Sequence, residues 1–271
     1  MIILRIANLQ RTLGFQSTME LPVATGGNIS TENLALRILE ISKHLQISYM
    51  DGYELVRVGG PADGGYIMLN NFEDIDGAIS LGVGPDISWD LDISKKIPLV
   101  HLYDHSITKM PNSIPSGTWF KEKAVAHSDL SGTSLEEMIS RIPESNRLLL
   151  KCDIEDSEWE IFSQCSKEIL QKFDQIVVEF HWIIEKLNND KFALLLATFE
   201  NLAQTHSVIN IHANNYAKFE IVANCPVPDV MEITYARTKS YKFEQKLRNL
   251  NLNASNSEEN PEIQLIFPIP S

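Results

Sequence analysis

Several features are missing from this sequence of 271 residues, and each absence excludes a class of protein. No cluster of lysine and arginine accompanies the formal net charge of -13, so long-range attraction to a nucleic acid is not expected. The cysteines, Cys152, Cys165 and Cys225, are odd in number and lack a Cys-x-x-Cys spacing, which argues against a disulfide framework or a zinc site. The sequence also lacks a secretory signal in residues 1–20 and any apolar run of membrane-spanning length. We therefore expect a cytoplasmic protein that binds neither nucleic acid nor membrane.

The length suffices for one large α/β domain with appendages. Apolar residues spaced four, three and four positions apart predict a helix over residues 31–47. We assign residues 1–55 to an N-terminal helical extension that acts as a lid, and residues 56–245 to the main domain. Residues 246–271 are polar and then punctuated by proline, which predicts a loosely attached C-terminal extension.

From residue 56 onward, short β-rich runs alternate with amphipathic segments of helical length. The candidate strands read YIML, AISLGVG, LVHLYDHS, WFKEKAVAH, RLLLKCDI, QIVVEFHW, SVINIHAN and VMEITYAR. Several are continuously apolar, which is typical of parallel strands covered by helices on both faces. The pattern predicts a doubly wound, mostly parallel α/β sheet. FEIVANC and VMEITYAR are separated only by PVPD, too short for a crossover helix, so we expect those two to pair antiparallel.

The segment ISLGVGPD places Gly82 and Gly84 where a buried strand turns into a helix, so a ligand can approach the backbone closely. Asp104 ends the next strand, where an acidic side chain reaches ribose hydroxyls in such folds. A dinucleotide fingerprint needs a third glycine where Ile87 stands. Asp86 opposes a pyrophosphate but suits the ammonium and sulfonium charges of S-adenosylmethionine. The alternative is a tight turn with Asp104 capping the following helix; the combination favours a nucleoside-containing ligand.

A second glycine-rich stretch, RVGGPADGGYIML, contains two Gly-Gly pairs that imply unusual backbone angles or a close approach. A hairpin turn is an equally weighted interpretation from composition alone. We include Gly64, Gly65 and the following Tyr66 among the predicted cofactor-binding residues. His105, next to Asp104, completes that set.

Three predicted strands end in polar side chains of the metal-binding or acid–base type. Asp153 ends RLLLKCDI, Glu179 and His181 end QIVVEFHW, and His212 lies in SVINIHAN. In an open α/β sheet, ligands bind at the carboxyl ends of the strands, so these side chains are predicted to converge beside the cofactor.

Two chemistries stay open for this cluster. Asp153, Glu179 and His181 could bind Mg²⁺ or Mn²⁺, which would hold a substrate hydroxyl and lower its pKa. Alternatively, His181 or His212 is a general base that the carboxylates orient. We take Asp153, His181 and His212 as the candidate catalytic residues. The remaining acidic residues of this segment are interpreted as charges at a helix N-terminus; they are Glu155, Asp156, Glu158 and Glu160.

LKCDIEDSEWEIF followed by VVEFHW resembles the K-D-[IV]-E-G-x-E-W and E-x-H segments of FkbM-type and related class I S-adenosylmethionine-dependent methyltransferases. RVGGPADGGYIM, SLGVGPD and IHANNY also resemble segments of that group, over about residues 56–237. Asp156 departs from the pattern, which usually has glycine there. The resemblance implies a seven-stranded Rossmann-like sheet with an antiparallel last strand. It further implies O-methylation of a hydroxyl on a sugar or small natural-product-type acceptor, with S-adenosylmethionine held by Gly82, Gly84 and Asp104.

Two other functions remain as alternatives. An NAD(P)-dependent oxidoreductase could use a similar sheet, but Ile87 and the lack of a Tyr-x-x-x-Lys pair at the expected position disfavour it. A non-catalytic binding module with a vestigial cofactor pocket is disfavoured by the intact polar endings of three strands. The sequence leaves the oligomeric state open.

Overall fold

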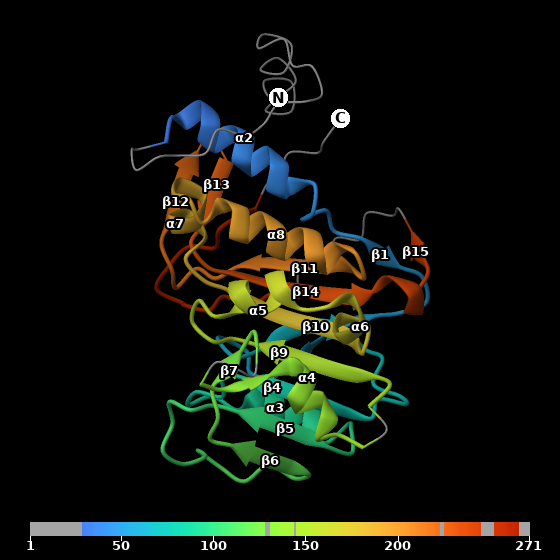
Figure 1. Ribbon diagram of the computed structural model, residues 1–271. Helices are drawn as coiled ribbons and strands as arrows, with labels where there is room; N and C mark the ends of the chain where they lie inside the picture. Colours follow the sequence, from blue (N-terminus) through green and yellow to red (C-terminus); the bar gives the residue numbers. More distant parts are fainter. Residues whose placement is uncertain (1–28, 128–130, 144, 223–224, 245–251, 266–271) are drawn as a thin grey trace.

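The computed structural model describes residues 29–127, 131–143, 145–222, 225–244 and 252–265. A seven-stranded sheet runs through its centre (Figure 1). In spatial order its strands are β11 (His206–Ala213), β14 (Met231–Arg237), β10 (Phe173–Phe180), β9 (Leu148–Cys152), β4 (Gly77–Leu81), β5 (Val100–Tyr103) and β6 (Gly117–Phe120). All are parallel except β14, which is antiparallel to both of its neighbours. This is the predicted Rossmann-like sheet with an antiparallel last strand.

Elements on both faces bury the sheet, which explains why its strands read as continuous apolar runs. The helices are α2 (Thr31–Ser42), α3 (Ser88–Ser94), α4 (Leu135–Ser140), α5 (Glu158–Gln164), α6 (Lys167–Leu170), α7 (Ile183–Asn188), α8 (Phe192–Ala203) and the 3-10 turn η1 (Thr238–Ser240). Successive residues of a strand point to opposite faces. Accordingly, Leu148 and Leu150 pack into a core with α5 and α8, and Leu149 packs into a core with α3.

Among the described residues, four short strand pairs lie outside the main sheet. They are β1 (Tyr49–Met50) with β15 (Phe243–Glu244), β2 (Leu55–Val58) with β3 (Tyr66–Leu69), β7 (Ala124–Val125) with β8 (Thr133–Ser134), and β12 (Phe219–Val222) with β13 (Cys225–Pro228). The β2–β3 hairpin covers the α3 face of the sheet: Thr234 of β14 donates a hydrogen bond to the Ile67 carbonyl at 2.6 Å. This hairpin brings Tyr66 towards the strand ends that form the candidate site.

The predicted pairing of FEIVANC with VMEITYAR is wrong. The first four residues of FEIVANC, Phe219–Val222, pair instead with Cys225–Pro228, and VMEITYAR is inserted between β10 and β11. The six residues Met231 to Ala236 are buried, and the central position offers β14 a hydrogen-bonded neighbour on each side. Three of the four residues of β12 are exposed, so that strand gains little from a central position.

Helix α2, in the predicted N-terminal extension, packs on α7 and α8. The buried Arg37 donates hydrogen bonds to the carbonyls of Leu187 at 2.6 Å and Asn189 at 2.8 Å, and its guanidinium lies 4.7 Å from the centre of the Phe192 ring. The lid role and the domain limits at residues 55 and 245 stay predictions. In the described part of the chain, the helices are too short or too polar to span a membrane.

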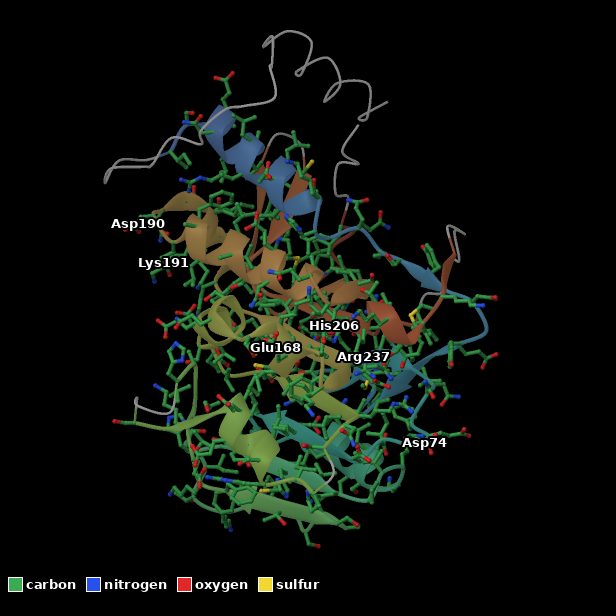
Figure 2. All side chains as sticks on the ribbon, turned by 45° about the vertical axis from the view of Figure 1, so that its right-hand side comes forward. Asp74, Glu168, Asp190, Lys191, His206 and Arg237 are labelled. Atoms are coloured by element: carbon green, nitrogen blue, oxygen red, sulfur yellow. The ribbon has the colours of Figure 1, made fainter. Side chains whose placement is uncertain are left out.

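The buried His206 makes the fold sensitive to acid. Its Nδ1 lies 2.7 Å from the Thr205 hydroxyl and its Nε2 lies 2.9 Å from the Phe173 carbonyl oxygen, while Arg237 is its cross-strand partner (Figure 2). Burial lowers the pKa of His206 from 6.5 to about 4; the Arg237 charge also lowers it, whereas Asp174 opposes the shift.

We expect acidification to weaken the fold through His206. Between pH 6.5 and about 4 the unfolded chain binds a proton on this imidazole that the folded chain does not, so the free energy of unfolding falls as the pH falls. The shift corresponds to a loss of about 3 kcal/mol at most. Urea unfolding across this pH range measures it, and His206→Gln should show a shallower pH dependence. Equal slopes for the two proteins would contradict the assignment.

Candidate functional site

Ionisable side chains form a row across the ends of four neighbouring strands. The register places Glu179 of β10 opposite Glu232 of β14, and Glu232 opposite His212 of β11. Asp153 follows the last residue of β9, whose partner in β10 directly precedes Glu179. Paired residues point to the same face of a sheet, so these side chains share one face. Of the predicted residues, the structure brings Asp153, Glu179 and His181 together, whereas His212 joins the row only through Glu232.

His181 lies two residues after Glu179 and therefore points to the same face. Its Nδ1 lies 3.0 Å from Glu158 Oε1, which also accepts the backbone N–H of His181 at 2.8 Å. Its Nε2 lies 3.8 Å from Asp153 Oδ1 and 3.8 Å from Glu179 Oε1, and makes no hydrogen bond within the described residues. Burial lowers the pKa of His181, but Glu158, Glu179 and Asp153 raise it to about 9. The carboxylate on Nδ1 orients the ring so that Nε2 points at the carboxylates.

Glu158 shows where one sequence interpretation was incomplete. It begins α5, as expected of a charge at a helix N-terminus, but its side chain is fully buried against His181. The signal was present in the sequence: Glu158 lies four positions before the buried Phe162 and thus on the apolar face of α5. Asp156, by contrast, pairs with the buried Lys186.

Glu179 is held by two uncharged donors. Asn214 Nδ2 donates to Glu179 Oε1 at 2.8 Å, and the Tyr66 hydroxyl donates to Glu179 Oε2 at 3.2 Å. Burial raises the pKa of Glu179 well above its usual range, and the charge of Asp153 raises it further. Burial and the same carboxylates also raise the pKa of Tyr66. Tyr66, predicted as a cofactor contact, thus lies among the carboxylates.

Asp153, Glu179 and His181 fit a divalent cation. One ligand atom from each residue lies within 4.8 Å of the other two. Two carboxylates and an imidazole suit Mn²⁺ or Mg²⁺, and an imidazole whose other nitrogen is bound to a carboxylate is the usual form of a histidine ligand. Because Nε2 must be deprotonated to bind a cation, binding would release a proton there.

The glycine turn lies against this cluster. Gly82 has a φ of +76°, and a Cβ at this position would lie 1.6 Å from the Asp153 carbonyl oxygen. Gly84 has a φ of +59°, but a Cβ there would meet no atom within 4 Å. The turn therefore leaves open space at Gly84 while its Gly82 end packs on the backbone of Asp153. Contact of this turn with a cofactor stays a prediction.

Asp104 shapes this turn. Its Oδ2 accepts the backbone N–H groups of Val83 at 3.0 Å and Gly84 at 3.1 Å, and its Oδ1 accepts from the backbone and hydroxyl of Ser106 at 2.7 and 2.6 Å. Burial raises the pKa of Asp104, but the Ser106 and backbone hydrogen bonds outweigh it and the pKa is lowered. Both oxygens are thus occupied by protein donors, and the contact with a ribose stays a prediction. The neighbouring His105 is exposed.

The second glycine-rich loop packs on the start of α3. Gly60 donates its N–H to Ser88 Oγ at 2.7 Å, and a Cβ on Gly64 would lie 2.8 Å from Asp86 Oδ2. A Cβ on Gly65 would lie 2.1 Å from the Gly60 carbonyl oxygen. Gly64 and Gly65 therefore adjoin the turn that carries the other predicted cofactor residues, and their direct contact with a ligand stays a prediction.

Lys151 links the glycine turn to the cluster. This buried side chain donates from Nζ to the Gly82 carbonyl at 2.6 Å, and Nζ lies 3.8 Å from Asp153 Oδ2. Sequence reasoning missed this role, although Lys151 lies two residues before Asp153 in a strand and so shares its face.

Residues 252–265, the described part of the C-terminal extension, are bound to the site, which corrects the expectation of loose attachment for this part; the rest of the extension lies outside the described residues. Asn215 Nδ2 donates to Ser255 Oγ at 2.7 Å and to the carbonyls of Ser257 and Asn260 at 2.9 Å each. Glu262 lies 3.2 Å from His212 Nε2, and Glu232 lies 3.2 Å from His212 Nδ1.

These contacts raise the pKa of His212. Burial alone would lower its pKa, but Glu232 and Glu262 outweigh burial and raise the pKa of His212 above 6.5. Neither glutamate was singled out from the sequence. Glu232 enters the site only through the strand register, and Glu262 only through the path of the C-terminal segment.

No protein-family model matches the chain, and neither does any curated protein. Several solved structures align with 60% of it. SMU.1697c from Streptococcus mutans, solved in complex with SAH, is 11% identical over 86% of its own chain, with a TM-score of 0.34. An rRNA methylase from Streptococcus thermophilus is 6% identical over 88% of its own chain, with a TM-score of 0.37. The fibrillarin/Nop5p complex is 9% identical over 72% of the matched chain, with a TM-score of 0.37. At these values the alignments carry no argument about function, and the assignment of the Rossmann-like fold rests on the strand order.

Proposed function

We propose that the protein is an S-adenosylmethionine-dependent methyltransferase that methylates a hydroxyl of a sugar or another small acceptor with the help of a divalent cation. One observation carries the proposal: the Gly82 turn packs directly on the backbone of Asp153. The place predicted for the cofactor therefore adjoins the polar groups predicted for the acceptor. The resemblance of LKCDIEDSEWEIF to FkbM-type segments supports the same reading.

The residues around the turn suit the cofactor. Open space at Gly84 would take the ligand, and the Asp86 carboxylate close to Gly64 would favour its positive charges. When bound, S-adenosylmethionine supplies an electrophilic methyl group on a sulfonium. Lys151 and Asp104 act on the protein side, because they hold the Gly82 carbonyl and the Val83 and Gly84 N–H groups in one geometry.

The acceptor side is the cation cluster. Asp153, Glu179 and His181 would hold a divalent cation, which would lower the pKa of an acceptor hydroxyl placed on it. Glu158 keeps the His181 ring oriented towards this position. Asp153 is the most exposed member, with 30% of its side chain accessible, so it faces the space from which an acceptor enters. Glu232 and Glu262 raise the pKa of His212, which favours its protonated form, and His212 would contribute by positioning.

The net charge of the protein and its free thiols indicate the kind of acceptor and the cellular compartment. A net charge of -13 favours a small or saccharide acceptor over a nucleic acid. The three cysteines carry free thiols, which favours a reducing compartment such as the cytoplasm.

Isothermal titration calorimetry tests the cofactor. We expect S-adenosylmethionine and S-adenosylhomocysteine to bind with a Kd below about 100 µM, equivalent to roughly 5 kcal/mol, and NADH to give no binding heat. The reason is that Ile87 and Asp86 disfavour a pyrophosphate while the open turn accommodates a nucleoside. Binding of NADH without either methionine-derived ligand would overturn the methyltransferase proposal in favour of an oxidoreductase.

A further inference from the structure

We propose that the site holds two divalent cations bridged by Glu179: one on Asp153, Glu179 and His181, and a second on Asp63, Glu179 and Glu232. This deepens the proposed function and rests on its cation cluster. In the second group, as in the first, one ligand atom from each residue lies within 4.8 Å of the other two. A carboxylate has two oxygens, each able to accept twice, so Glu179 can serve both positions.

The second group contains an unfavourable pair of buried carboxylates. Glu179 and Glu232 are direct cross-strand partners. Glu179 is only 6% exposed and Glu232 only 5%. Like charges directly opposite each other in a sheet are destabilising, and the burial of both carboxylates adds to that cost. A cation between them would offset both terms.

The nearby guanidinium of Arg57 does not fill that role. Its Nε donates to the Gly60 carbonyl at 2.7 Å and its terminal nitrogen donates to the Ala62 carbonyl at 2.6 Å. Within the described residues, no salt bridge joins Arg57 to Asp63 or Glu232. Arg57 therefore binds the glycine-rich loop rather than the carboxylate pair. Glu232 has the His212 ring at 3.2 Å on its outer side, and Glu179 has His181 Nε2 at 3.8 Å, so neither imidazole lies between the two carboxylates.

Asn256 of the C-terminal segment is the independent sign of a ligand. Its side chain is 92% buried and points into the group: Nδ2 donates to Glu232 Oε1 at 2.6 Å and to Asp63 Oδ1 at 3.1 Å. Its Oδ1 is buried and has no hydrogen-bond partner in the described part of the chain. A half-turn of the amide would direct Oδ1 at both carboxylates. That orientation is repulsive alone, but it supplies a neutral oxygen ligand when a cation lies between them.

The donor types identify the ion. The second position offers only oxygen atoms, from Asp63, Glu179, Glu232 and Asn256, which suits a hard cation such as Mg²⁺, Mn²⁺ or Ca²⁺. The first position adds the His181 imidazole, which Mn²⁺ also accepts. Mn²⁺ therefore serves as one probe for both positions, and its unpaired electrons report whether two bound ions share a ligand.

The test is the number of Mn²⁺ ions bound by the full chain after removal of metal with EDTA. We expect two per chain by electron paramagnetic resonance, with an exchange-coupled spectrum because Glu179 joins them. Asp63→Asn, which alters an exposed loop residue, should weaken one ion at least about tenfold and abolish the coupling. Glu232→Gln should do the same. Glu160→Gln, an exposed change elsewhere on α5, should bind two coupled ions like the wild type.

A single Mn²⁺ in the wild-type chain, or two equally tight coupled ions in Asp63→Asn, overturns the proposal. If Glu232→Gln fails to fold by circular dichroism, Asp63→Asn decides the matter alone. Cofactor binding is measured separately by calorimetry. If the protein binds two coupled ions but does not bind S-adenosylmethionine, this inference stands and the proposed function is refuted. If it binds the cofactor but only one ion, the proposed function stands and this inference is refuted.

Discussion

The Asp153→Asn variant will bind S-adenosylmethionine like the wild type and transfer its methyl group at least about 100-fold more slowly. The amide keeps the shape of the side chain and the packing of Gly82 on the backbone of residue 153, so the cofactor side is preserved. It removes the negative charge that lies 3.8 Å from His181 Nε2 and that would ligate the cation. Turnover is followed as S-adenosylhomocysteine formed with a mixture of monosaccharides, polyols and phenols.

His181→Ala provides a second arm of the same test. Because both side chains would serve one cation, the loss in the double variant should be close to that in either single variant rather than their product. Glu160→Gln is the matched control, since it removes an exposed carboxylate from the same acidic stretch and should keep full activity. Unchanged turnover in both Asp153→Asn and His181→Ala would remove these residues from the mechanism. A wild-type chain that binds the cofactor but methylates none of the acceptors would exclude small hydroxyl compounds of these classes.

Gly82→Ala will destabilise the protein by more than about 4 kcal/mol, whereas Gly84→Ala will cost only about 1–2 kcal/mol. Both glycines have a positive φ, so both variants carry the backbone strain of an alanine in the left-handed region. Only at residue 82 does the added carbon meet another atom, at 1.6 Å from the Asp153 carbonyl oxygen, which belongs to the backbone and cannot rotate away. The difference between the variants therefore isolates the packing of the turn on the site.

Urea unfolding of the two variants measures this difference. If Gly82→Ala does not accumulate as folded protein while Gly84→Ala does, the direction of the prediction is met. Stabilities of the two variants within about 1 kcal/mol of each other would show that the turn is not packed on Asp153, and the link between cofactor and acceptor sites would lose its basis.

The candidate site could be predicted in part because strand ends are visible in the sequence. RLLLKCDI and QIVVEFHW each contain three consecutive apolar residues before their polar ends, so Asp153, Glu179 and His181 stand out at the carboxyl ends of buried strands. When such strands are parallel neighbours in a sheet, their carboxyl ends lie at the same edge. The pairing of VMEITYAR was predicted wrongly. A short connection to the preceding run suggests a hairpin, but it does not prevent the strand from pairing with other strands of the sheet.

The alternation of apolar, strand-length runs with amphipathic helical segments by itself determined the doubly wound sheet. Strands that are buried on both faces must be apolar along most of their length. Tertiary structure alone decided that Glu232 stands opposite Glu179, that Glu158 contacts the His181 ring, and that Asn256 donates to the carboxylates. The physical reason is the separation along the chain between the residues that determine each feature. Side-chain periodicity is a local property of the backbone, whereas strand register and the path of the C-terminal segment depend on contacts between residues far apart in the chain.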